Sequence, residues 1–263
     1  MGPTSRSMET VTSLMPMGTG IGMERVLAEA GRSLILSSST SKVSYICDKL
    51  KMQSSPRVAM DGTFENLIVL NSPAHAISVD NNAPLLIRGV TIDNSAGDNG
   101  NLGHNTDVCL PHLRNFSRDL LLTSHNSKGF DVSANNVTIE NCIVKNQDDC
   151  IAINGGSNIV FQNNSCSGGH GISIGSISSG KTVSDVTISD NTVTKSMYGL
   201  RIKAQAAATS GSVSRIIYSG NTVSGISKYG VLITQSYPAD FGSPGTKTTI
   251  RYVKAFPVFE SVK

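Results

Sequence analysis

The sequence predicts an all-β protein, a single-stranded right-handed parallel β-helix that is truncated at its ends. Short runs of apolar, β-branched residues recur along much of the chain, and Gly, Asn, Asp or Ser separate them every few residues. These polar residues and Gly favour tight turns, and repeats of roughly 20–50 residues are typical of solenoids built from stacked coils. A β-sandwich also has short strands and frequent turns, and it is the competing architecture.

Four segments share the repeat most clearly. Their first apolar runs begin 22, 27 and 30 residues apart, at Val137, Ile159, Val186 and Ile216. A second apolar run follows each of them, at Ile151–Ile153, Ile172–Ile174, Leu200–Ile202 and Val231–Ile233. Alternate residues of such strands point into a shared core. Asn that recurs at one turn is expected to stack into hydrogen-bonded ladders.

The repeat divides the chain into three segments. Residues 61–246 are predicted to form the β-helix catalytic domain, with an insertion at 108–128. Residues 1–60 lack strand alternation, so we interpret them as a non-native segment outside the domain. Residues 247–263 lose the Asn and Gly turns and are expected to form an atypical tail.

Composition excludes some classes of protein. Charged residues make up 16% of the chain and the net charge is +3, which argues against disorder and is compatible with an acidic polymer as substrate. No apolar run approaches the ~20 residues of a membrane span, and residues 1–12 hold no apolar signal-peptide core. We therefore expect no membrane partner, and no nucleic-acid partner either.

The five cysteines are an odd number, so at least one is unpaired. Cys150 and Cys166 bracket one strand–turn–strand unit and could close a short disulfide loop, or they could be two buried thiols. The sequence has no paired Cys-x-x-Cys spacing, and we expect neither a metal nor a cofactor.

Four short clusters place functional groups near equivalent turns of successive coils: Asn105–Asp107, Gln147–Asp149, Gly169–Gly171 and Arg201–Lys203. Equivalent positions of a solenoid line up on one face, so these groups should converge on a groove. Crowded carboxylates raise the pKa of at least one of them, which places a general acid beside a general base. Taken singly, the clusters are more typical of solvated turns, calcium ligands, a structural histidine or a solvent-facing strand.

In this order, Asn-Thr-Asp, Gln-Asp-Asp-Cys, Gly-His-Gly-Ile-Ser-Ile-Gly and Arg-Ile-Lys resemble the signature of the glycoside hydrolase family 28 polygalacturonases. The resemblance implies that Asp148 is the general acid, that Asp107 and Asp149 activate water, and that His170 supports them. It also implies inversion at the anomeric carbon, which requires acid and base carboxylates about 6.5–9.5 Å apart.

The same resemblance assigns the remaining site residues. Arg201 and Lys203, which share one face of a strand, would bind the galacturonate carboxylate, with Asn105 also binding substrate. Tyr237 matches the active-site tyrosine of the family, and the pair Cys150 and Cys166 matches a family disulfide.

The sequence departs from the family beside the proposed site. The family continues Asn-Thr-Asp directly into Gly-Phe-Asp, whereas 21 residues, 108–128, intervene here. This insertion begins with Val, whose codons start GT, and ends with Lys, one of whose codons ends AG. We interpret it as a retained intron; a genuine loop is the alternative.

Residues 1–40 resemble out-of-frame translation, because a shifted reading of Gly20–Arg25 yields Tyr-Trp-Asp-Gly-Glu, and 41–60 resemble another unspliced piece.

We therefore expect an endo-acting, inverting polygalacturonase that cleaves α-1,4 links of polygalacturonate, monomeric and secreted in its parent form. This exact chain would be impaired or inactive. The alternatives are an exo-acting or rhamnogalacturonan-cleaving relative, a calcium-dependent pectate lyase, a β-helix that only binds polysaccharide, and an inactive fragment or gene-model artefact.

Overall fold

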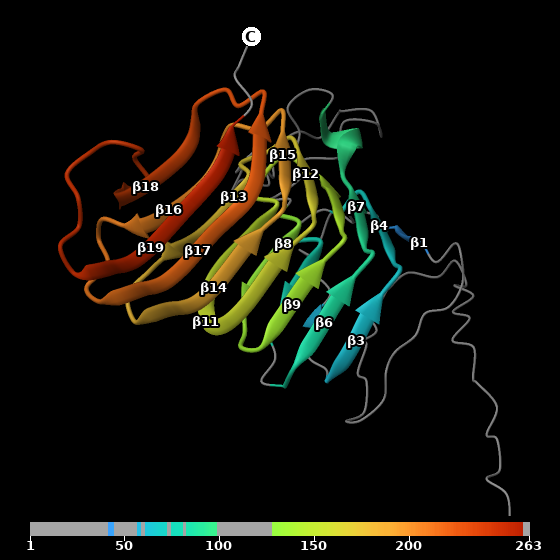
Figure 1. Cartoon of the computed structure of the whole chain (residues 1–263), viewed down its shortest axis with the longest axis horizontal. Coiled ribbons are helices and arrows are strands. Elements are labelled where there is room, and N and C mark those ends of the chain that lie inside the picture. The colour runs from blue at the N-terminus through green and yellow to red at the C-terminus, as the bar shows by residue number, and fades with distance from the viewer. Residues whose placement is uncertain are drawn as a thin grey trace, which may run out of the picture.

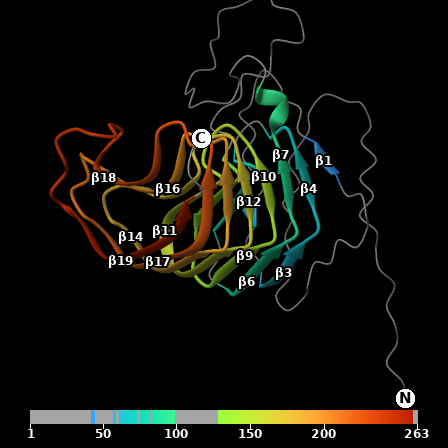
Figure 2. The same ribbon diagram turned by 45° about the horizontal axis from the view of Figure 1, so that its top comes forward.

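The computed structural model describes residues 42–44, 57–58, 61–72, 75–80, 83–98 and 128–259. They wind into a solenoid whose strands stack side by side along one axis, from β3 at one end to β19 at the other (Figures 1 and 2). The strands of each coil pair in parallel with those of the coils before and after it. The predicted parallel β-helix is confirmed.

Three series of strands run along the solenoid. The first comprises β3 (Gly62–Glu65), β6 (Leu85–Arg88), β9 (Val137–Glu140), β11 (Ile151–Gln162), β14 (Lys181–Ser189), β17 (Gly211–Ser224) and β19 (Thr248–Phe259). The second comprises β1 (Lys42–Ser44), β4 (Ile68–Leu70), β7 (Thr91–Asp93), β10 (Ile143–Lys145), β12 (Ser165–Ser167) and β15 (Thr192–Thr194), and it ends against β17.

The third series carries the functional residues described below. It comprises β2 (Arg57–Val58), β5 (Ile77–Val79), β8 (Phe130–Ser133), the start of β11, β13 (Ile172–Ile177), β16 (Tyr198–Gln205) and β18 (Tyr229–Tyr237). A short 3-10 helix, η1 (Ser95–Asp98), follows β7.

Strand register agrees with the repeats read from the sequence. Ile159 pairs with Val137 on one side and Val186 on the other, and Val186 pairs with Ile216. The second runs align in the same way, Ile151 with Ile172, Ile172 with Leu200, and Leu200 with Val231. Because strands alternate, the side chains in these rows, apart from Val231 at the end of the solenoid, form continuous buried columns.

Equivalent turns of successive coils share a left-handed backbone conformation. Asn136, Asn158, Asp185 and Arg215 have φ between 55° and 57° at matching positions. Asn and Asp tolerate this conformation better than other non-glycine residues, which explains their recurrence in the sequence. Arg215 is the exception, and its guanidinium donates hydrogen bonds of 2.6 and 2.7 Å to the Asp185 carboxylate one coil below.

Buried asparagines form the predicted ladder. The Asn164 side-chain amide donates to Asn191 Oδ1 at 3.1 Å, and that of Asn191 donates to Asn221 Oδ1 at 2.9 Å. Each amide also donates to a backbone carbonyl, that of Ile139, Phe161 or Ile188 respectively. The ladder thus ties the turns of three coils together inside the protein.

Replacing Asn191 by Ala should lower the free energy of unfolding by about 2–4 kcal/mol. The buried groups that bond to Asn191, on Asn164, Asn221 and Phe161, would be left without that hydrogen bond. The matched control is Asn158→Gly, which keeps a left-handed turn and removes one exposed amide hydrogen bond to Asn136. It should change stability by well under 1 kcal/mol. Urea denaturation measures both, and equal losses would show that the buried ladder is not stabilising.

The β-helix extends beyond the predicted boundaries 61–246. Strands β1 and β2 lie within residues 1–60, and they pair in parallel with β4 and β5. Strand β19 lies within residues 247–263 and pairs with β17 along most of its length. The expected atypical tail therefore supplies a strand. Its β-branched residues at Thr248–Ile250 continue the parallel strand pairing without an Asn turn. Residues 108–127 of the insertion lie outside the described residues.

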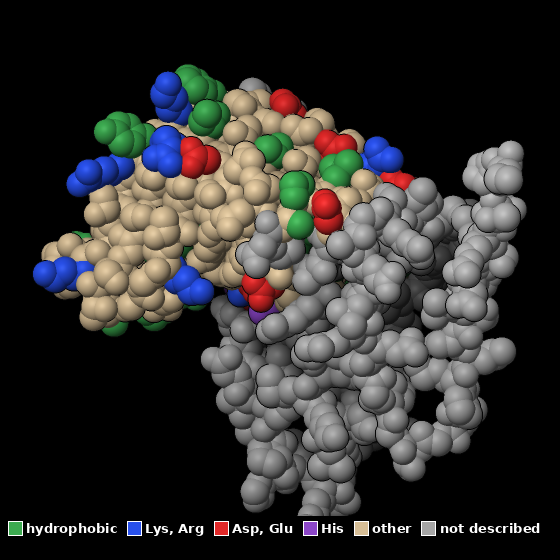
Figure 3. All heavy atoms as spheres, turned by 90° about the horizontal axis from the view of Figure 1, so that it is seen from below, with side chains coloured by type: hydrophobic (Ala, Val, Ile, Leu, Met, Phe, Trp, Pro, Cys, Tyr) green, Lys and Arg blue, Asp and Glu red, His purple; other side chains and the backbone are tan. Residues whose placement is uncertain are grey.

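At the β18 end, inward-facing side chains are partly open to solvent. Val231 and Ile233 are 38% and 50% exposed, whereas their register partners Leu200 and Ile202 are fully buried. No further strand of the described residues covers them. On the face in Figure 3, charged side chains of the described residues lie scattered among neutral ones.

The pairing of Cys150 with Cys166 is confirmed as a disulfide, with Cα atoms 5.8 Å apart. It links the start of β11 to β12 in the next coil. Cys142 is a buried free thiol, and Cys47 and Cys109 lie outside the described residues. No helix in the described part of the chain is long and apolar enough to span a membrane.

Candidate active site

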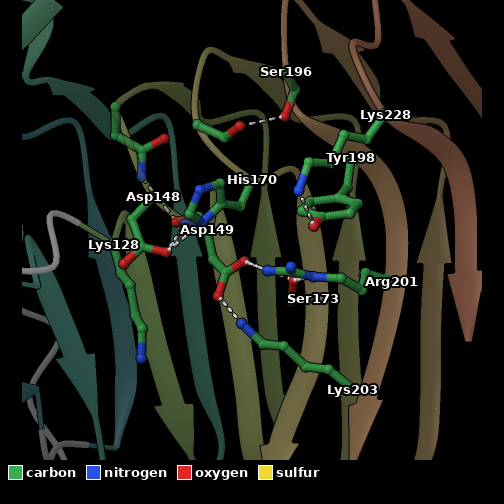
Figure 4. A network of polar contacts seen from close by, with 12 residues as sticks. Lys128, Asp148, Asp149, His170, Ser173, Ser196, Tyr198, Arg201, Lys203 and Lys228 are labelled. Atoms are coloured by element: carbon green, nitrogen blue, oxygen red, sulfur yellow. Dashed lines mark hydrogen bonds and ion pairs between the residues drawn. The ribbon is translucent and has the colours of Figure 1, made fainter. Parts of the chain in front are cut away.

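The third strand series and the turns that lead into it bring most of the predicted site residues together. Asp148 and Asp149 lie between β10 and β11, and His170 lies between β12 and β13, one coil further on. Arg201 and Lys203 lie on β16, in the coil after that. Figure 4 shows these five side chains pointing toward one another across the strands. Key groups of three of the four predicted clusters therefore lie together on one face, and the fourth cluster, Asn105–Asp107, lies outside the described residues.

Asp149 is the centre of the cluster and is fully buried. Its Oδ1 accepts hydrogen bonds from Arg201 Nη2 at 2.7 Å and from the Ser173 hydroxyl at 2.6 Å. Its Oδ2 accepts one from Lys203 Nζ at 2.6 Å. Arg201 Nε also donates to the Ser173 hydroxyl at 3.1 Å. Two cations and a hydroxyl therefore hold both oxygens of this carboxylate.

These contacts set the charge of Asp149. Burial by itself raises the pKa of Asp149, but the charges of Lys203, Arg201 and His170 outweigh burial and hold that pKa far below its ordinary value. We had expected crowding of carboxylates to raise the pKa of at least one of them. For Asp149 the direction is opposite, because the nearest charges are cations rather than carboxylates.

Asp148 has different surroundings. Its Oδ1 accepts the backbone N–H of Asp149 at 2.6 Å and lies 3.1 Å from His170 Nδ1. Its Oδ2 is buried and has no hydrogen-bond partner among the described residues. Asp148 therefore has one oxygen held in place and one oxygen that is free of the surrounding described protein groups.

Arg201 and Lys203 share one face of β16, while Ile202 between them points into the core, as strand alternation predicts. Each of the two basic side chains is only 5% exposed and is bound to Asp149. Burial lowers the pKa of Lys203, and the contact with Asp149 only partly offsets it. Lys203 Nζ lies 5.4 Å from the ring centre of Tyr237, the predicted tyrosine at the end of β18, whose pKa burial and Asp149 raise.

Several residues near the site were not assigned a role from the sequence. Ser173 lies in register with Arg201, and the Ile-Ser-Ile alternation of β13 would have placed its hydroxyl on the groove face. Tyr198 packs against Arg201, and no periodic signal marks it. On the other side of Asp149, Asp131 contacts Lys128 at 3.2 Å and His75 at 3.4 Å.

Asn105 and Asp107 lie outside the described residues, so their predicted roles stay predictions. Asp148, Asp149 and His170 offer ligand atoms that all lie within 4.8 Å of one another, the spacing of a metal site. A metal would compete with Arg201 and Lys203 for the Asp149 oxygens, so the cluster is built for two protein cations rather than for an ion.

The same distance bears on the expected carboxylate spacing. Asp148 and Asp149 each have an oxygen within 4.8 Å of the other, closer than the ~6.5–9.5 Å expected of an inverting pair. The expected spacing is therefore wrong for these two residues, because they are adjacent in one turn. The separation between Asp148 and Asp107 lies outside the described part of the chain.

Fold and site together define a parallel β-helix protein with a buried site of two carboxylates, a histidine, an arginine and a lysine on one strand series. The chain belongs to family 28 of the glycosyl hydrolases, because the sequence model "Glycosyl hydrolases family 28" matches residues 37–255. The match includes both strands that lie before residue 61 and most of β19.

Individual relatives agree with this assignment. The chain is 49% identical over 193 residues to a polygalacturonase of Penicillium janthinellum, covering 72% of this chain and 45% of that protein. It is 44% identical over 190 residues to an endo-polygalacturonase of Sclerotinia sclerotiorum, covering 71% and 43%. The chain therefore spans about half the length of the curated relatives it matches.

Among solved structures, endopolygalacturonase I from Stereum purpureum complexed with two galacturonate is similar with a TM-score of 0.67 and 55% sequence identity. The similarity covers 78% of this chain and 56% of that one.

Proposed function

We propose that this chain hydrolyses the α-1,4-galacturonosyl links of polygalacturonate, the de-esterified backbone of pectin, by endo-acting general acid and base catalysis. The observation that carries the proposal is Asp148, a buried carboxyl whose Oδ2 has no partner among the described residues, directly beside Asp149 and its two cations. Membership of family 28 and the polygalacturonase relatives support the same substrate.

The basic pair matches an acidic sugar. Arg201 uses Nε and Nη2 for Ser173 and Asp149, and Lys203 uses one hydrogen bond for Asp149. A guanidinium has five donors and an ammonium three, so both retain donors for a galacturonate carboxylate. A second anion at this point also balances the charge of the site, because two cations there face one Asp149 carboxylate.

In the proposed reaction, Asp148 protonates the leaving glycosidic oxygen through Oδ2. Asp107 accepts the proton of the attacking water beside the fixed negative charge of Asp149, and His170 holds Asp148 in position through its 3.1 Å contact. Both oxygens of Asp149 are bound by cations and the side chain is fully buried. It is therefore poorly placed to attack the anomeric carbon itself, which favours water as the nucleophile and inversion of configuration despite the short spacing. The anomer released first, followed by proton NMR, tests the stereochemistry.

Tyr237 and Asn105 complete the proposed substrate contacts. We propose that the full-length parent enzyme is secreted and monomeric, and the Cys150–Cys166 disulfide supports an oxidising compartment.

The test measures new reducing ends from polygalacturonate for four proteins: residues 1–263, the same chain without 108–128, and each of these two chains with Asp148→Asn. Asp190→Asn, on an exposed turn, is the matched control. We expect cleavage that Asp148→Asn abolishes and that Asp190→Asn and a chelator leave unchanged. Mixed oligomers identify endo action, single galacturonate units exo action, and unsaturated products a lyase.

The deleted chain separates the two interpretations of the insertion. If only the chain without 108–128 cleaves, the hydrolase and the retained intron are both supported. If both cleave, the insertion is a tolerated loop. Binding of the polymer without cleavage by either chain would overturn the hydrolase in favour of a binding module.

A further inference from the structure

We propose that Tyr198, anchored by Asp240 and Lys228, is a positioning residue that holds the Arg201 guanidinium against Asp149. The inference rests on the proposed function of the same site. Tyr198 itself touches neither Asp149 nor the expected position of the reacting atoms, so its role is exerted through Arg201.

The ring of Tyr198 supports the guanidinium from one side. Tyr198 is 4% exposed, and Arg201 Cζ lies 4.2 Å from its ring centre. In Figure 4 the ring lies beside the Arg201 side chain, which extends past it toward Asp149. At this distance a cation is attracted to the face of an aromatic ring. The flat ring therefore limits the orientations open to a long, flexible side chain, whose freedom would otherwise oppose a fixed contact.

The hydroxyl of Tyr198 fixes the ring in turn. It donates to the Asp240 carboxylate, with oxygen–oxygen distances of 2.8 and 2.7 Å. Lys228 Nζ lies 3.3 Å from both the Tyr198 hydroxyl and Asp240 Oδ2, and Figure 4 shows the first of these contacts. The three groups form a closed polar triangle at the hydroxyl end of the ring.

Asp240 is itself held by the protein. Its backbone carbonyl accepts hydrogen bonds from the hydroxyls of Thr234 and Ser236, both on β18. The turn after β18 is thus fastened to that strand, and through Tyr198 it reaches β16. Arg201 and Tyr198 both lie on β16. The contact of Tyr198 with the turn after β18 therefore fixes the position of the Arg201 guanidinium relative to the β16 backbone.

The ring of Tyr198 also contacts the other half of the site. It meets the His170 ring edge to face, with centres 6.2 Å apart. His170 in turn contacts Asp148. Tyr198 therefore contacts both Arg201, which binds Asp149, and His170, which contacts Asp148. A tyrosine with only a structural role would not need both contacts.

The consequence concerns the charge of Asp149. Among the described residues, those that act on it electrostatically are Lys203 and Arg201 from β16, His170 from the turn before β13, Tyr237 from the end of β18, and Lys128 and His75 from the segments before β8 and β5. Without the ring, Arg201 has only Ser173 and Asp149 to hold it and is released more often. The pKa of Asp149 then rises toward its ordinary value. As the pH is lowered, Asp149 in the variant becomes protonated at a higher pH than in the parent chain.

The test compares Tyr198→Leu, Tyr198→Phe and Asp240→Asn with Tyr218→Leu. Tyr218 is a fully buried tyrosine of β17 away from the site, so it reports the effect of losing a buried ring alone. For Tyr198→Leu we expect kcat/KM to fall about threefold or more and its acid limb to move to higher pH by about half a unit, the size of a lost cation–π contact. Tyr198→Phe keeps the ring but loses the anchoring hydroxyl, so it and Asp240→Asn should lie between Tyr198→Leu and the parent chain.

Tyr218→Leu should lower the midpoint of urea unfolding and leave the acid limb in place. If Tyr198→Leu also changes stability alone, with an unmoved acid limb, the positioning role is wrong. A double-mutant cycle of Tyr198→Leu with Arg201→Met, followed by urea unfolding, needs no activity. We expect the unfolding constants to depart from independence by about threefold or more. Independent effects would overturn the inference even if the hydrolase is active, and coupling in an inactive chain would refute only the proposed function.

Discussion

Asp148→Asn is expected to reduce the turnover number by about 10²–10⁴-fold, the contribution of a well-placed general acid, with little change in KM. The amide oxygen of Asn can still accept the Asp149 backbone N–H that Oδ1 accepts now, so the turn between β10 and β11 should keep its shape. The lost function is the acidic proton at Oδ2, which no amide can supply at neutral pH.

Steady-state kinetics on polygalacturonate, alongside a urea unfolding curve, measure both quantities. Asp190→Asn changes an exposed Asp on a turn of another face and should match the parent chain in both. If Asp148→Asn retained more than about a tenth of the turnover, Asp148 could not be the general acid of this site.

Asp149→Asn is expected to remove activity and also to destabilise the protein by about 3–5 kcal/mol, because it leaves Arg201 and Lys203 buried without their shared anion. Lys203, whose pKa burial already lowers, can lose its proton in the variant and limit the damage. Adding Lys203→Met to Asp149→Asn should restore part of the stability without restoring activity, because removing both members of a buried pair is far less harmful than removing one.

The destabilisation has a defined pH dependence. The pKa of Asp149 is depressed in the folded state, so its carboxylate stabilises the protein above the unfolded-state pKa of about 3.9. That contribution is lost as the pH falls below this value toward the folded pKa. The stability difference between the parent chain and Asp149→Asn should therefore be largest near neutral pH and shrink below about pH 4. A difference that stayed constant down to pH 3 would contradict the ion-pair explanation.

The proposed roles of Asp148 and Asp149 differ because their neighbours differ, and not because of their positions in the sequence. They are adjacent in the chain, yet one is enclosed by cations and the other keeps an oxygen without a described partner. In the proposed reaction, Asp149 therefore serves as a fixed anion and Asp148 as the acid, because their surroundings differ.

Repetition made much of the fold readable from the sequence. The apolar runs at Val137, Ile159, Val186 and Ile216 and the Asn turns predicted stacked coils, because local alternation and turn chemistry are properties of neighbouring residues. The same logic placed Asp148, His170 and Arg201 on one face, because equivalent positions of a solenoid must align. The ends were misjudged at β1, β2 and β19, where the strands lack the Asn turns that marked the others.

Sequence by itself determined that this chain is a β-helix of family 28 type with its site at the turns that hold Asp148, Asp149 and His170. Only the tertiary structure decided which charged and aromatic side chains bind one another. Arg201 and Lys203 bind Asp149 across 52 and 54 residues of chain, and Tyr198 is tied to Asp240 across 42. Those partnerships depend on strand register and burial, which no local pattern encodes, because a charge is paired or left free only when the coils around it have closed.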